Sequence, residues 1–364
     1  MKIAKKFLTL ITLCIFLISC TACGDTSWAL KSDTETLSTG VYVYYLMEAY
    51  QKATDTLLEK GISTTDLKNE TIEDKNAVTW TKDRAVNSCK TLLTIDKMFS
   101  DMNLSLTEEE NKKVEETTDS IWESSGEIYE KNFGINKDAV NQAYSLFNAK
   151  KDKVFKAIYG KDGTNAVSDD ELNEYYKNNY ISLKFYSKMP FENDSEESEN
   201  EENTNTQEGT LDTDENIQKQ FSGYVEAINS GAQTIQQIND TIKSTDHIDD
   251  GMEPLEDQLI NPKSNDLPKE IVDAVSGLEP EKSTYVKYND IYLFLYRNPS
   301  TNETIELPDL SNEIDRDKIL LEYKNDEFNN KIEDTKQNMN IKINTNAINQ
   351  FDVAMFNKNT SQAQ

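Results

Sequence analysis

The chain has 364 residues, of which 66 are acidic and 38 basic, so its net charge is −28 at pH 7. This length allows two or three domains, and the charge argues against nucleic acid as a partner because phosphates would be repelled. One histidine and four cysteines give little support for a disulfide scaffold, a His-rich metal site or a nucleophile–histidine pair. No nucleotide-binding or calcium-loop motif is present. We therefore expect no cofactor, no metal and no catalytic residue of these kinds.

The N-terminus has the pattern of a secretory signal peptide. Three lysines precede an apolar run over residues 7–18, which is too short for a membrane-spanning helix of about 20 residues. Leu17 at −3 and Ser19 at −1 before Cys20 resemble a bacterial lipobox. The resemblance implies removal of residues 1–19 and lipidation of Cys20, with Cys23 as the alternative. The chain would then be lipid-anchored on the extracytoplasmic face of the cell membrane.

Helical periodicity dominates the next part of the chain. Apolar residues recur every four positions from Val41 to Leu57, and a second stripe covers residues 81–102. Thr107 and Glu110 predict a capping box that starts a third helix. Asn136 is expected to cap a fourth helix that ends at Gly160, with Tyr144 and Phe147 on its apolar face.

The middle of the chain mixes helices and strands. Ser168 and Glu171 predict another capping box, and an acidic low-complexity loop is expected at 191–215 because it has too little apolar surface to order itself. Residues 251–266 are expected to form a loop. The other predicted elements are strands at 183–189, 283–287, 291–297 and 339–343, and helices at 214–230, 233–242, 267–277 and 311–338, the last with Ile314, Leu321, Phe328 and Ile332 inward.

Several short motifs resemble the SurA/PrsA-type extracytoplasmic foldases, in which a discontinuous helical chaperone domain flanks an inserted parvulin domain. They are Phe133-Gly134-Ile135, Val167 to Leu172 followed by Tyr175-Tyr176, the segment 267–280 and the strands within 285–296. The resemblance implies a mostly α fold with an α+β insert. The expected parts are a signal peptide (1–19), an N-terminal helical chaperone-like domain (20–165), a parvulin-like domain (166–302), a C-terminal helix and strand completing the helical domain (303–356) and a disordered tail (357–364).

The parvulin-like part departs from the family at its histidines. The first strand of the family carries an Arg-His pair, but the matching stretch here is Leu183-Lys184-Phe185-Tyr186. A second histidine belongs to the last strand, which here reads Ile291-Tyr292-Leu293-Phe294. The glycine-rich stretch near 250 is reduced to Asp250-Gly251-Met252, and His247 matches neither family histidine. Since isomerisation needs a shaped apolar pocket rather than a nucleophile, the enzyme assignment stays open.

The resemblance implies a membrane-anchored chaperone that binds unfolded or newly secreted proteins, with weak or no prolyl isomerase activity. The candidate client-binding residues are the aromatic side chains of Tyr42, Tyr45, Tyr144 and Phe147, although such stripes more often form core. One alternative is an active peptidyl-prolyl isomerase of the same family. Another is a surface-interaction or solute-binding lipoprotein, which the lack of repeated βα units disfavours.

Overall fold

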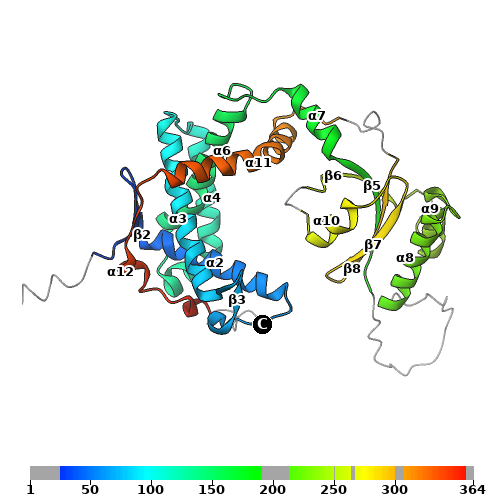
Figure 1. The fold of residues 1–364 in the computed structure, drawn as a ribbon, viewed down its shortest axis with the longest axis horizontal. Helices are drawn as coiled ribbons and strands as arrows, with labels where there is room; N and C mark the ends of the chain where they lie inside the picture. Colours follow the sequence, from blue (N-terminus) through cyan, green and yellow to red (C-terminus); the bar gives the residue numbers. More distant parts are fainter. Residues whose placement is uncertain (1–24, 191–212, 250, 264–266, 300–306, 358–364) are drawn as a thin grey trace, which may run out of the picture. The chain divides into compact units, whose positions relative to one another are not determined.

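The computed structural model describes residues 25–190, 213–249, 251–263, 267–299 and 307–357. The chain forms two compact units (Figure 1). The helical unit comprises Met1–Ala166 and Lys324–Gln364, and the α+β unit is Val167–Tyr323. The fold is therefore mostly helical, with an α+β insert. The signal peptide, Cys20, Cys23, residues 191–212 of the acidic loop and residues 358–364 of the tail lie outside the described residues.

The second boundary falls after Tyr323, whereas the sequence places it after residue 302. Helix α11 (Glu313–Gln337) runs through this boundary. Its first half belongs to the α+β unit because Arg316, which is 3% exposed, donates hydrogen bonds to Asp169 Oδ1 (2.8 Å) and to the carbonyl of Val167 (2.7 Å). A continuous helix contains no sequence signal for such a change of partner.

The helical unit is built around α2 (Thr39–Leu58), which packs extensively against α3 (Ala77–Asp101). A small antiparallel sheet of order β2-β1-β9 joins the two chain segments, since Leu30 of β1 pairs with Ile343 of β9. The strands of this unit are β1 (Trp28–Lys31), β2 (Thr36–Ser38), β3 (Thr71–Ile72), β4 (Lys75–Asn76) and β9 (Lys342–Ile343). Its other elements include α4 (Glu108–Ile128), a π-helical segment at Tyr129–Phe133, α12 (Thr345–Ile348) and short 3-10 turns at Leu67–Asn69 and Val353–Phe356.

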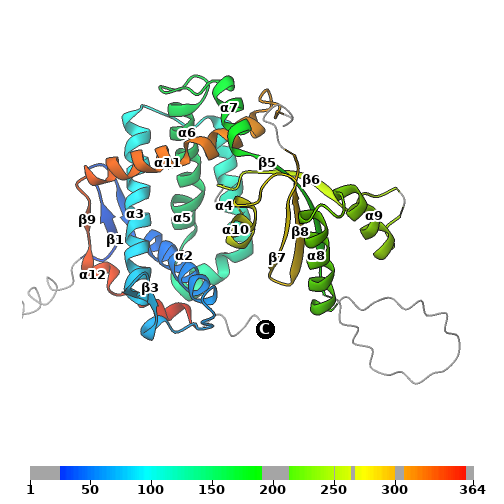
Figure 2. The same ribbon diagram turned by 45° about the vertical axis from the view of Figure 1, so that its right-hand side comes forward.

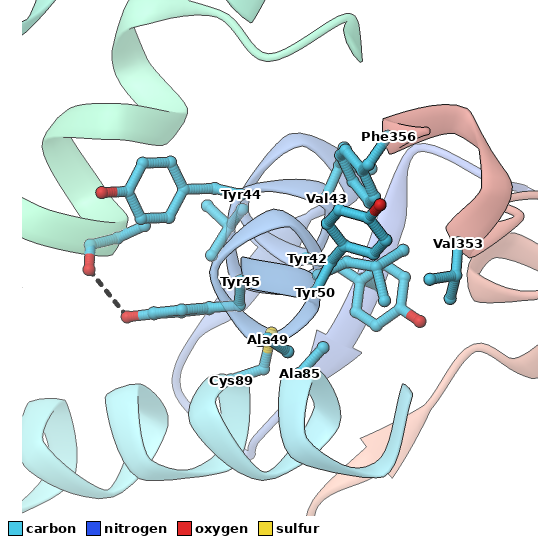
Figure 3. Packing of buried hydrophobic residues seen from close by; sticks show 14 of the residues in the cluster. Tyr42, Val43, Tyr44, Tyr45, Ala49, Tyr50, Ala85, Cys89, Val353 and Phe356 are labelled. Carbon is cyan, nitrogen blue, oxygen red and sulfur yellow. Dashed lines mark hydrogen bonds between the residues drawn. The ribbon is translucent and has the colours of Figure 1, made fainter. Parts of the chain in front are cut away.

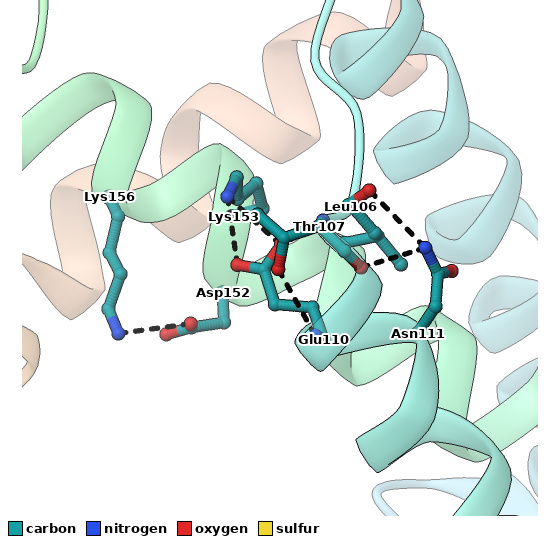
Figure 4. A network of polar contacts seen from close by, with 7 residues as sticks. All are labelled: Leu106, Thr107, Glu110, Asn111, Asp152, Lys153 and Lys156. Carbon is teal, nitrogen blue, oxygen red and sulfur yellow. Dashed lines mark hydrogen bonds and ion pairs between the residues drawn. The ribbon is translucent and has the colours of Figure 1, made fainter.

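The predicted capping box at the start of α4 is present (Figure 4). Thr107 Oγ1 accepts the backbone N–H of Glu110 at 3.2 Å, and Glu110 Oε2 accepts the backbone N–H of Thr107 at 2.7 Å. Lys153 of α6 (Phe147–Tyr159) also donates to both carboxylate oxygens of Glu110, at 2.8 and 3.0 Å. One carboxylate thus caps α4 and ties it to α6.

The helix expected from Asn136 to Gly160 is divided into three pieces. Asn136 caps α5 (Lys137–Val140), a π-helical segment follows at Asn141–Leu146, and α6 ends at Gly160. The wider π turn shifts the face that points inward. Tyr144, expected on the apolar face, is 40% exposed, while its neighbours Ala143 and Ser145 are buried.

The α+β unit contains an antiparallel four-stranded sheet of order β6-β5-β8-β7 (Figure 2). Alternate residues of β8 separate two apolar clusters: Tyr292, Phe294 and Tyr296 pack with α8 and α9, whereas Leu293 and Leu295 pack with α10. The elements are α7 (Asp169–Asn179), β5 (Ile181–Lys188), α8 (Asp214–Asn229), α9 (Ile235–Thr245), β6 (Glu256–Ile260), α10 (Lys269–Ser276), β7 (Ser283–Tyr288) and β8 (Ile291–Arg297).

Three details of the sequence prediction are wrong. The expected loop 251–266 contains strand β6, whose residues Glu256–Ile260 lack apolar alternation and become a strand by pairing with β5. Asp214 and Glu215, which the sequence assigns both to the acidic loop and to the helix at 214–230, form the first turn of α8, so the loop assignment is wrong for these two residues. Ile314 and Leu321 of α11 are 79% and 48% exposed. The expected inward stripe fails there because the buried residues of this half of α11 include Ile319 and Leu320 instead.

Candidate functional site

The tyrosine-rich face of α2 belongs to the core of the helical unit (Figure 3). Tyr42 is fully buried and Tyr45 is 6% exposed. The Tyr45 hydroxyl donates to the carbonyl of Ala143 at 2.7 Å, and burial raises the pKa of both phenols. The expectation that Tyr42 and Tyr45 contact clients is therefore contradicted, because their rings are not accessible in this structure.

Phe147 lies in a small cleft of the helical unit. The cleft has a volume of about 180 Å³ and apolar walls from Leu37, Leu92, Leu146 and Phe147. Sites for drug-sized ligands are about 300–1,000 Å³, so this cleft has room for one side chain rather than for a cofactor. Tyr144 lies on the adjacent π-helical segment and is partly exposed. Phe147 and Tyr144 thus remain candidates for client contact.

An ion pair completes this cleft. Lys150 Nζ lies 2.5 Å from Asp96 Oδ1, and the two side chains are 21% and 14% exposed. The same ammonium lies 5.6 Å from the ring centroid of Phe99. Because the two charges neutralise each other at short range, the cleft offers apolar walls beside a compensated polar pair.

A second candidate surface is the side of the four-stranded sheet that packs on α10. Leu183, Leu295 and Val275 are buried there, but Phe185, Leu293 and Ile271 are only partly buried. The 8-residue α10 is too short to cover the strands. The face therefore presents partly buried apolar side chains around a small buried cluster.

This face also includes residues of the two stretches in which the SurA/PrsA-type resemblance places histidines. In these two stretches, Leu183, Phe185 and Leu293 pack with the cluster on the α10 side. His247 is exposed and follows α9, which packs on the other side of the sheet. These three residues are apolar and offer no side-chain proton donor or acceptor.

The described part of the chain contains one cysteine, which is buried, and no cluster of three potential metal ligands. Cys89 is fully buried, and burial raises the pKa of its thiol, so it behaves as a small apolar core residue. Within residues 25–357, excepting the undescribed gaps, no group of three acidic, histidine or cysteine side chains is placed to hold a metal ion. In the same residues, no helix is long and apolar enough to cross a membrane.

Comparison with known proteins finds no matching family model and no matching curated protein. Similar solved structures include foldase protein PrsA from Streptococcus pneumoniae, with 14% identity over 73% of this chain and 87% of that chain and a TM-score of 0.33. Peptidylprolyl isomerase PrsA from Bacillus cereus has 17% identity over 78% and 96%, with a TM-score of 0.30. Foldase protein PrsA from Lactococcus lactis has 10% identity over 90% and 97%, also with a TM-score of 0.30. A likeness at this level assigns no activity to this chain.

Proposed function

We propose that this protein is a lipid-anchored extracytoplasmic chaperone that binds unfolded or newly secreted proteins and has weak or no prolyl isomerase activity. The observation that carries the proposal is the insertion of an α+β unit into a helical unit made from two chain segments. This is the organisation that the SurA/PrsA-type resemblance implies. The signal-peptide pattern and Cys20 support the location.

Client binding is assigned to surfaces that are apolar and still accessible. The α10 side of the sheet offers Phe185, Leu293 and Ile271, and the cleft of the helical unit offers Phe147. Partly exposed aromatic and aliphatic side chains gain most when they meet apolar residues of an unfolded chain. A surface of this kind suits many clients because it requires no particular polar group.

The reduced isomerase activity follows from the same surface. A catalyst must stabilise the twisted amide against a barrier of about 18–20 kcal/mol. The apolar residues Phe185 and Leu293 provide a site for a proline ring but no hydrogen bond to the twisted amide. We therefore place binding, rather than isomerisation, at the centre of the function.

The test is suppression of client aggregation by the chain from Gly24 onwards, mixed with an unfolded secreted protein at physiological salt. We expect suppression at a near-stoichiometric ratio. No suppression at a large excess would overturn the chaperone proposal and favour a surface-interaction lipoprotein. Catalysis on a proline-containing peptide, measured on the same sample, would favour the active-isomerase alternative.

A further inference from the structure

The cleft that contains Phe147 combines side chains from separate parts of the helical unit. Leu37 of β2 and Leu92 of α3 are buried, whereas Leu146 and Phe147, where the π-helical segment meets α6, are only partly buried. The volume of about 180 Å³ fits one side chain of a ligand and is smaller than sites for drug-sized molecules. The cleft can therefore hold a polypeptide by a single apolar residue.

Three charged side chains line the same cleft, and two of them neutralise each other. Lys150 Nζ lies 2.5 Å from Asp96 Oδ1, and the two side chains are 21% and 14% exposed. Glu35 is exposed, and its carboxylate has no hydrogen-bond or ion-pair partner among the described residues. Two carboxylates and one ammonium leave the cleft with one uncompensated negative charge, which is on Glu35.

The geometry of the β1–β2 hairpin places Glu35 on the side of the cleft. Leu30 pairs with Leu37 across the hairpin, and near the turn the backbone N–H of Ser32 donates to the carbonyl of Glu35 at 2.9 Å. Side chains of a strand alternate between its two faces. Glu35, two positions before Leu37, therefore lies on the same side of the hairpin as Leu37, which is 3% exposed and forms a wall of the cleft.

The cleft also offers a polar group that suits the main chain of a ligand. Gln142 of the π-helical segment lines the cleft and is exposed. Its side-chain amide has no hydrogen-bond partner in the part of the chain that the structure describes. A side-chain amide both donates and accepts hydrogen bonds, as a peptide group does. The cleft thus combines apolar walls, one available carboxylate and one available amide.

We propose that this cleft binds a client segment in which a bulky apolar residue stands next to a basic one. The apolar side chain enters the cleft and contacts Leu92 and Phe147, and the basic side chain pairs with Glu35. A basic neighbour is favoured over an acidic one because the cleft keeps one negative charge and the whole chain has a net charge of −28. This proposal rests on the proposed chaperone function and names the kind of segment that the helical unit prefers.

The experiment measures binding of three fluorescent peptides to the chain from Gly24 onwards at low and physiological salt. The peptides share Gly- and Ser-rich flanks and carry Leu-Arg, Leu-Glu or Ala-Arg at the centre. We expect the Leu-Arg peptide to bind about tenfold more tightly than either of the others at low salt. Equal binding of the Leu-Glu peptide would overturn the role of Glu35, and equal binding of the Ala-Arg peptide would overturn insertion of an apolar side chain.

The variant series uses Glu35→Gln and Glu35→Lys, with Glu59→Lys as the matched control. Glu59 is exposed and caps the C-terminal end of α2, whereas the hairpin with Glu35 precedes the N-terminal end of this 20-residue helix, about 30 Å away. We expect Glu35→Gln to weaken the Leu-Arg peptide about threefold. Glu35→Lys should reverse the preference in favour of the Leu-Glu peptide, while Glu59→Lys keeps the original order. The same change in Glu35→Lys and Glu59→Lys would reduce the effect to net charge and overturn the proposal.

Two outcomes separate this proposal from the proposed function. Suppression of client aggregation without any binding of the Leu-Arg peptide would overturn the cleft site and leave the chaperone function intact. Failure of both assays would overturn both. A concentration-dependent dimer that Glu35→Lys dissociates, with no peptide bound, would overturn client binding in the cleft and assign it to a second copy of the chain.

Discussion

Phe185 and Leu293 lie on the same side of the β5–β8 pair, because Phe185 pairs with Leu295 and Leu293 pairs with Ser187 two positions along. Such diagonal neighbours are within reach of each other. They occupy the stretches in which the foldase resemblance places histidines. Two apolar side chains on one face of the sheet thus stand where the resemblance implies a hydrogen-bonding pair.

The apolar character of these two positions predicts that prolyl isomerisation is slow. Without a side chain that can donate to the twisted amide, we expect exchange between the cis and trans forms of a proline peptide to stay within a few-fold of the uncatalysed rate. Exchange spectroscopy by NMR on the chain from Gly24 onwards checks this. Efficient turnover at substoichiometric protein would contradict it.

Substitution at two positions of β5 separates client binding from stability. Phe185→Ala removes a partly exposed ring, so we expect weaker client binding and a small change in the free energy of unfolding. The control is Leu183→Ala, since Leu183 is 3% exposed and its truncation leaves a cavity costing about 2–5 kcal/mol. The measurements are client affinity and urea unfolding. Unchanged client binding by Phe185→Ala would remove the α10 side from the binding surface.

The ion pair of Lys188 and Asp246 predicts a large loss of stability on truncation. Its Nζ–Oδ1 distance is 2.8 Å, the side chains are 10% and 11% exposed, and Tyr186 also donates to Asp246. Asp246→Asn leaves a buried ammonium without its carboxylate, which costs about 3–5 kcal/mol. Asp257→Asn is the control: Asp257 is 63% exposed, so we expect a loss below about 1 kcal/mol. Urea unfolding measures both, and equal losses would contradict the role of burial.

Removing the hydroxyl group from each of two tyrosines of α2 is expected to change the stability of the helical unit in opposite directions. Tyr42 Oη is buried with no hydrogen-bond partner among the described residues, whereas Tyr45 Oη donates to Ala143. We expect Tyr42→Phe to stabilise the helical unit by up to about 1 kcal/mol and Tyr45→Phe to destabilise it by about 1 kcal/mol. Labelling of Cys89, the single cysteine from Gly24 onwards, reports opening of this core. Faster labelling in both variants would contradict the prediction for Tyr42.

The lipobox predicts that one cysteine carries the anchor. In a cell that processes lipoproteins, Cys20→Ser should release the chain from the membrane fraction, while Cys23→Ser should leave it bound. Detergent-phase partitioning and mass spectrometry of the N-terminal peptide check this. The reverse pattern would assign the lipid to Cys23.

The sequence by itself determined the helix caps and turns, because these depend on side chains close together along the chain. The capping boxes at Thr107 and Ser168, the N-cap at Asn136 and the β7–β8 turn depend on residues a few positions apart, so their patterns predict them.

Tertiary structure alone decided which residues are accessible. Strand β6 exists because β5 pairs with it, and Tyr144 turns outward because a π segment interrupts its helix. Ile314 and Leu321 are exposed because the first half of α11 buries Ile319 and Leu320 instead. The tyrosines of α2 are core because α3 and the C-terminal segment cover them. Each depends on contacts between residues distant along the chain, which periodicity within one element does not encode.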